Sequence, residues 1–109
     1  MAYDEGLAQR VRELIMDVAE FSEKKMFGGI CFMVDGNMAC GVIGYDVIVR
    51  VGPHNYEAAL RAPGVRVFDF TGRPMKGWVV VSSESHESDE QLADWINQGV
   101  TFALSLPSK

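Results

Sequence analysis

Two cysteines are the first candidates for chemistry in this sequence. Cys31 and Cys40 flank Asp35-Gly36, a dipeptide that tolerates positive φ angles and therefore predicts a tight hairpin turn. With a two-residue loop, Cys31 faces Cys40 at an α-carbon separation of about 4.5 to 5.5 Å, which suits a redox-sensitive disulfide. A three-residue loop instead places Cys31 opposite Gly41. Inert, half-buried thiols are the alternative interpretation, because little nearby in the sequence would lower a thiol pKa.

Basic side chains near one tryptophan form the second candidate site. Arg50, Arg66, Arg73, Lys76 and Trp78 all belong to predicted strands or border them, so they are candidates to converge at one end of a sheet. Arginine and lysine donate strong hydrogen bonds to carboxylates and phosphates. The hypothesis is a small patch that binds an anion or an acidic peptide. The alternative is ordinary solvated charge paired with nearby carboxylates.

The remaining reactive residue types do not form a recognisable catalytic or metal-binding pattern. His54 and His86 lie far apart in expected turns, without the close ligand spacing of a zinc site, and are expected to be solvated. Ser83, Ser85, His86 and Asp89 include the residue types of a hydrolase triad, but they share one polar connector, whereas triads assemble from distant segments. We therefore expect no catalytic residue, no metal and no cofactor.

The length and composition predict one globular domain spanning residues 1–109. The 109 residues are 48% apolar and 23% charged, which is typical of a folded chain and not of a disordered one. No apolar run reaches the roughly 18 residues of a membrane span, and the N-terminus lacks the pattern of a signal peptide, so we expect a cytoplasmic protein. The net charge of -5 argues against direct nucleic-acid binding.

The apolar spacing predicts helices and strands that could position the candidate residues. Helical periodicity and caps predict three helices, and alternating or β-branched runs predict five strands. In chain order they are a helix over 5–21 capped by Asp4, a hairpin within 25–43, a strand over 47–51, a helix over 55–62, strands over 65–70 and 75–81, and a helix from 88 to 106 that begins with a capping box of Ser88 and Gln91.

This order, α-β-β-β-α-β-β-α, predicts a two-layer α+β fold. A five-stranded antiparallel sheet would carry the helices on one face. The other face would then expose part of Cys31, Met33, Val49 or Trp78. Because an apolar sheet face left without helices usually marks an interface, we expect a homodimer or a protein partner.

Several short motifs together resemble the N-terminal domain of the TfoX/Sxy proteins over roughly residues 7–107. They are Met26-Phe27-Gly28-Gly29, Gly36-Asn37-Met38, Arg50-Val51, Phe68 with Gly72-Arg73-Pro74-Met75, Gly77-Trp78, Leu92, Trp95 and Leu104-Ser105-Leu106-Pro107. The resemblance implies a fold like that of secretion chaperones and a link to natural competence through transcription co-regulators. Regulators of this group carry a second, helical domain, and residues 1–109 are expected to correspond to the first domain alone.

The sequence therefore favours a regulatory or protein-binding domain without catalysis. The first alternative is a thiol-based redox sensor that uses Cys31 and Cys40. An enzyme is the second alternative, but the sequence offers no pair of titratable residues at a useful spacing.

Overall fold

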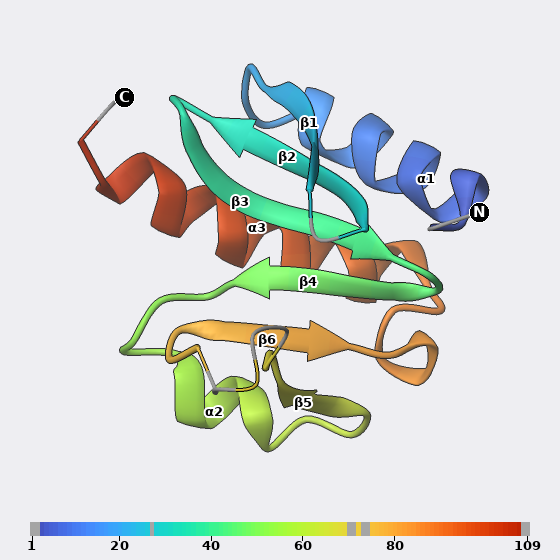
Figure 1. The fold of residues 1–109 in the computed structure, drawn as a ribbon, viewed down its shortest axis with the longest axis vertical. Helices are drawn as coiled ribbons and strands as arrows, with labels where there is room; N and C mark the ends of the chain where they lie inside the picture. Colours follow the sequence, from blue (N-terminus) through green and yellow to red (C-terminus); the bar gives the residue numbers. More distant parts are fainter. Residues whose placement is uncertain (1–2, 27, 70–71, 73–74, 108–109) are drawn as a thin grey trace.

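The computed structural model describes residues 3–26, 28–69, 72 and 75–107. Within these residues the chain forms three α-helices, six β-strands and one 3-10 helix (Figure 1). In chain order they are α1 (Glu5–Met16), β1 (Ser22–Met26), β2 (Gly29–Val34), β3 (Asn37–Ile43), β4 (Asp46–Arg50), α2 (Tyr56–Leu60), β5 (Val65–Val67), β6 (Trp78–Val81), the 3-10 helix Ser83–Ser85 and α3 (Asp89–Ser105). None of the described helices is both long and apolar enough to cross a lipid bilayer.

The six strands form one open antiparallel sheet in the order β1-β2-β3-β4-β6-β5. The prediction of five strands was wrong by one, because β1 pairs with β2 along its whole length and lies at the edge of the sheet. The sequence of β1, Ser-Glu-Lys-Lys-Met, has no alternation of apolar residues and therefore carries no strand signal. The predicted helix over 5–21 was correspondingly too long, since α1 ends at Met16.

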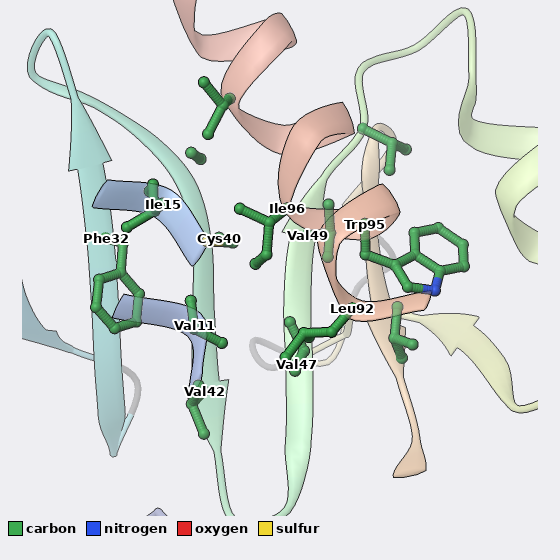
Figure 2. Close-up of a cluster of buried hydrophobic side chains, with 14 of the residues drawn as sticks. Val11, Ile15, Phe32, Cys40, Val42, Val47, Val49, Leu92, Trp95 and Ile96 are labelled. Atoms are coloured by element: carbon green, nitrogen blue, oxygen red, sulfur yellow. The ribbon is translucent and has the colours of Figure 1, made fainter. Parts of the chain in front are cut away.

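All three helices pack on one face of the sheet, as the two-layer prediction required. In Figure 1, α1 and α3 run behind the strands, and α2 lies near β5 and β6. Figure 2 shows Val11 and Ile15 of α1 and Leu92 and Ile96 of α3 directed into one buried cluster with side chains of β2, β3 and β4. Burial of this cluster is the main force that holds the helices on the sheet.

Two helix caps occur where the sequence placed them. The Asp4 side chain accepts a hydrogen bond of 2.9 Å from the Leu7 amide at the start of α1. Ser88 and Gln91 form a capping box at the start of α3, in which each side chain bonds the backbone of the other residue. Both caps satisfy amides that have no partner inside the helix.

The β2–β3 hairpin contains a bulge that the sequence did not reveal. Asp35 and Gly36 have φ angles of 52° and 80°, as expected for a two-residue loop. Met33 pairs with Met38, but Phe32 pairs with Cys40, so β3 holds one extra residue, Ala39. The extra residue reverses the facing of all later β3 side chains relative to a regular hairpin.

The sheet face without helices carries a second apolar cluster. Cys31, Met38, Ile48, Phe68 and Val80 are buried there, and Met33, Ile43, Met75 and Trp78 pack against them while partly exposed. Phe68 and Met75 come from the segment between β5 and β6, and these two residues pack over part of this face. The expectation of an apolar second face is met at Met33 and Trp78. It was wrong for Val49, which faces the helices, and for Cys31, which is buried.

Candidate functional site

The two cysteines do not face one another. The bulge at Ala39 pairs Cys31 with Gly41, so the predicted pairing of Cys31 with Cys40 was wrong. Cys31 belongs to the cluster on the open face and Cys40 to the core beneath the helices, and both thiols are free. Burial raises the pKa of Cys31 to about 11 and also raises that of Cys40. Both groups are therefore neutral, weakly nucleophilic thiols at pH 7.

The histidines differ from one another in their surroundings. His54 is exposed between β4 and α2, as expected. His86 is only 4% exposed, so the prediction of a solvated side chain was wrong. Its Nε2 lies 3.1 Å from the Tyr45 carbonyl oxygen, which can only accept, so Nε2 carries the proton. In the described part of the chain, no group of three or more side chains is placed to hold a metal ion.

The serine, histidine and aspartate side chains that could have formed a hydrolase triad each make a structural contact instead. The Ser85 hydroxyl donates to the Pro63 carbonyl, and the His86 ring bonds the Tyr45 carbonyl. Asp89 accepts from Arg10 at 3.3 Å. These side chains support the connector between β6 and α3, and their partners do not align them as a nucleophile and its base.

The predicted basic patch is divided between two ends of β4. Arg66 donates to the Asp46 carboxylate at 2.8 Å at one end of the strand, which makes an exposed ion pair. Arg50 lies at the other end, where its guanidinium carbon is 5.1 Å from the centre of the Trp78 ring. Lys76 is exposed in the turn before β6, and Arg73 lies outside the described residues. Among the described members of the predicted set, only Arg50 and Trp78 are shown in contact.

Phe102 completes the arrangement at Arg50 and was missed by sequence reasoning. The Arg50 guanidinium carbon lies 5.2 Å from the centre of the Phe102 ring on α3, so the cation sits against two aromatic rings. Phe102 lies in the predicted helix from 88 to 106, and no sequence signal indicates that it meets a strand residue 52 positions earlier. We call Arg50, Trp78 and Phe102 the arginine stack.

A glycine makes room for the arginine stack. Gly52 follows β4 with a φ angle of +89°, and a Cβ atom there would lie 2.5 Å from the Phe102 ring. Only glycine combines this backbone conformation with so close an approach. The chain can therefore turn beneath Phe102 and continue to α2.

A groove lined mainly by residues with polar groups begins beside the arginine stack and runs along α3. Its volume is about 340 Å³. Its lining consists of Val51, Asn55, Asp94, Asn97, Gln98, Thr101, Phe102 and Ser105. Most of its polar groups are neutral amides and hydroxyls, which can both donate and accept hydrogen bonds. We call this the α3 groove.

A second, smaller groove of about 180 Å³ lies on the open face of the sheet. Its apolar lining is Ile43, Ile48, Val67, Phe68 and Val80, and its polar lining is Asp46, Arg66 and Asp69. We call this the open-face groove. It exposes part of the second apolar cluster next to the Arg66–Asp46 ion pair, so it can accept an apolar side chain with polar groups beside it.

The two faces of the molecule differ in charge. Lys24, which pairs with Cys31, and the strand residues Arg50 and Arg66 lie in the rows of the open face, where the carboxylates are Asp46 and Asp69. The helix layer instead exposes many acidic side chains. Among them are Glu5, Glu13, Asp17, Asp89 and Glu90. The open face is therefore the more positive side of an acidic protein.

Comparison with known proteins identifies the family of the chain. The model of the TfoX N-terminal domain matches residues 13–103, which is most of the sequence. The comparisons with curated proteins and with solved structures gave no match. The matched range includes all six strands, α2 and most of α3. This chain belongs to the TfoX N-terminal domain family.

Proposed function

We propose that this chain is a non-catalytic regulatory domain that binds a partner protein on the open face of its sheet. The observation that carries the proposal is the open-face groove, which presents an apolar floor of Ile48 and Val80 beside Arg66. The regulatory part of the proposal rests on membership of the family. The absence of catalysis is supported by the hydrogen bonds of the reactive side chains, which, within the described residues, join each of them to a different structural partner.

The charge of the open face favours an acidic partner. Lys24, Arg50 and Arg66 project from the same side of the sheet, whereas the helix layer is acidic. A partner surface with carboxylates around an apolar side chain would match both the groove and its positive surroundings. The proposed ligand is therefore an acidic protein segment that places one apolar side chain in the open-face groove.

Peptide selection tests this proposal even though the partner is unidentified. A library of random 12-residue peptides is displayed on phage and selected on the immobilised protein. We expect selected peptides to combine Asp or Glu with a large apolar residue. Binding should be lost in Ile43→Glu, which places a carboxylate at the groove, and retained in Arg61→Glu, an exposed charge change on the C-terminal side of α2. No enrichment, or binding that survives Ile43→Glu, would contradict the proposal.

A homodimer through the same face is the second candidate, because the face is apolar. Two copies joined this way would bring their positive residues together, so added salt would screen the repulsion and strengthen the dimer. Binding of an acidic segment would instead weaken as salt increases. Sedimentation equilibrium of the protein alone between about 50 and 500 mM salt, beside peptide titrations in the same buffers, separates the two candidates.

A further inference from the structure

The cation of the arginine stack has no anionic partner in the described part of the chain. Arg66 is paired with Asp46, and Arg12 with Glu23 on β1, whereas Arg50 contacts aromatic rings and makes no ion pair with a described carboxylate. Ring contacts engage the flat face of a guanidinium, while its N–H donors point outward in the plane. The two rings restrain the Arg50 guanidinium, and no hydrogen bond from its N–H groups to another described residue is present.

The α3 groove supplies neutral hydrogen-bonding groups next to this cation. Phe102 belongs both to the stack and to the groove, and Asn97, Gln98 and Thr101 line the groove before it. Amide side chains of this kind satisfy the donors and acceptors of an extended peptide backbone. The only carboxylate in the groove lining is Asp94, which precedes Phe102 by eight residues and so lies roughly 12 Å away along the helix axis.

We infer that the arginine stack is a receptor for a carboxylate carried by an extended peptide that lies in the α3 groove. The carboxylate accepts hydrogen bonds from Arg50, and the peptide backbone bonds the amides of α3. The inference rests on the proposed protein-binding function, but it concerns the Arg50 end of β4, whereas the open-face groove lies at the Asp46 end. The carboxylate is that of an Asp or Glu side chain, as in the acidic segment proposed above, and a C-terminal carboxylate is the alternative that the test separates.

Three short peptides distinguish the sources. The first is acetyl-Gly-Ser-Glu-Ser-Gly-amide, with one acidic side chain. The second is acetyl-Gly-Ser-Gln-Ser-Gly with a free C-terminal carboxylate, and the third is the same glutamine peptide as an amide, which has no charge. Each is titrated into ¹⁵N-labelled protein, and the Arg50 Nε–H, the Trp78 indole N–H and the amides of Asn97 and Thr101 are followed by NMR.

We expect the Glu peptide to bind about ten-fold more tightly than the neutral peptide, because a charge-assisted hydrogen bond contributes about that factor. A free-acid peptide that binds more tightly than the Glu peptide would overturn the side-chain assignment and identify a C-terminus instead. The Arg50 Nε–H resonance should shift in wild-type protein with the charged peptide only. Equal binding of all three peptides, or shifts confined to other surfaces, would overturn the inference.

Matched variants separate this site from the open-face groove. Arg50→Gln should remove the ten-fold preference for the charged peptide, whereas Arg66→Gln, with the same change in net charge, should retain it. Phe102→Leu keeps the cation but removes one ring, so it should lower the preference several-fold. Ile43→Glu should leave carboxylate binding unchanged even though it blocks the open-face groove. Equal preference in wild type and a folded Arg50→Gln protein would reject the assigned role of Arg50.

Discussion

At the scale of single residues, Gly99 shows how one missing side chain sets the distance between helix and sheet. A Cβ atom at Gly99 would lie 2.3 Å from the Ala39 carbonyl oxygen. That carbonyl belongs to the bulge of β3, so the bulge and the glycine of α3 fit together. The close approach lets Ile96 and Val100, which flank Gly99, reach the buried cluster.

We expect Gly99→Ala to destabilise the protein by about 1–3 kcal/mol in urea unfolding. The new methyl group must push α3 away from β3, and this cost exceeds the gain of roughly 1 kcal/mol from better helix propensity. Gly6→Ala on α1 is the control, because its Cβ would lie 3.4 Å from an Asp4 carboxylate oxygen and meets no backbone. That variant should be neutral or slightly stabilised. A Gly99→Ala protein as stable as Gly6→Ala would show that α3 does not depend on this contact.

The burial of the cysteines leads to a prediction about their reactivity. A rise in the pKa of Cys31 from 9.0 to about 11 reduces its thiolate fraction at neutral pH by about 100-fold. We therefore expect a thiol reagent to label the native protein at least about 100-fold more slowly than the urea-unfolded protein at pH 7.5. Because the pKa of Cys31 is raised, labelling of the native protein should also accelerate as the pH rises toward 11. Fast native labelling, with a disulfide after mild oxidation, would favour the redox sensor instead.

At the scale of elements, two predictions that depended on local chemistry were confirmed. Asp35-Gly36 located the hairpin, and Ser88 with Gln91 located the start of α3, because turn and cap geometry depend on a few adjacent residues. The prediction that failed at β1 depended on apolar alternation, which a charged edge strand does not need. The register of the cysteines failed because the bulge at Ala39 is matched to Gly99, 60 positions away.

The difference between local and long-range contacts also explains which residues of the candidate site could be predicted from the sequence. Arg50 and Trp78 were found together because both lie in predicted strands, and the pairing of β4 with β6 places them opposite one another. Phe102 was not found, because the contact between a helix and the end of a strand depends on how α3 lies across the sheet. Arg66 was expected near Arg50, but its carboxylate partner Asp46 lies at the opposite end of β4.

The capping box gives a prediction for α3 as an element. Ser88→Ala removes the side-chain acceptor for the Gln91 amide, so we expect a loss of about 1 kcal/mol in the free energy of unfolding. The loss should lower the stability of the whole protein, since α3 packs on β3, β4 and α1. Ser105→Ala, at the other end of α3, is the matched control with a change of less than about 0.5 kcal/mol. Equal effects in the two variants would mean that the box adds no stability.

At the scale of the whole molecule, an open sheet must avoid pairing with other sheets through its edges. β1 is one edge of the described sheet, and it carries Lys24 and Lys25, both exposed. β5 is the other edge and has only three residues, Val65–Val67. Charged and short edge strands are the usual protection against edge-to-edge association. The exposed lysines of β1 therefore protect the longer edge, while the open face remains available for a partner.

This protection can be tested by the double change Lys24→Val and Lys25→Val. We expect the variant to form dimers and larger aggregates by light scattering at concentrations where the wild type does not, because β1 loses its two lysines and becomes a more apolar edge strand with free backbone groups. Removing two positive charges also makes the net charge of -5 more negative, which by itself opposes association. An increase would therefore not be an effect of the net charge. Lys76→Val, an exposed change outside the strands, should stay like the wild type, and a double variant that does so too would refute the role of the edge lysines.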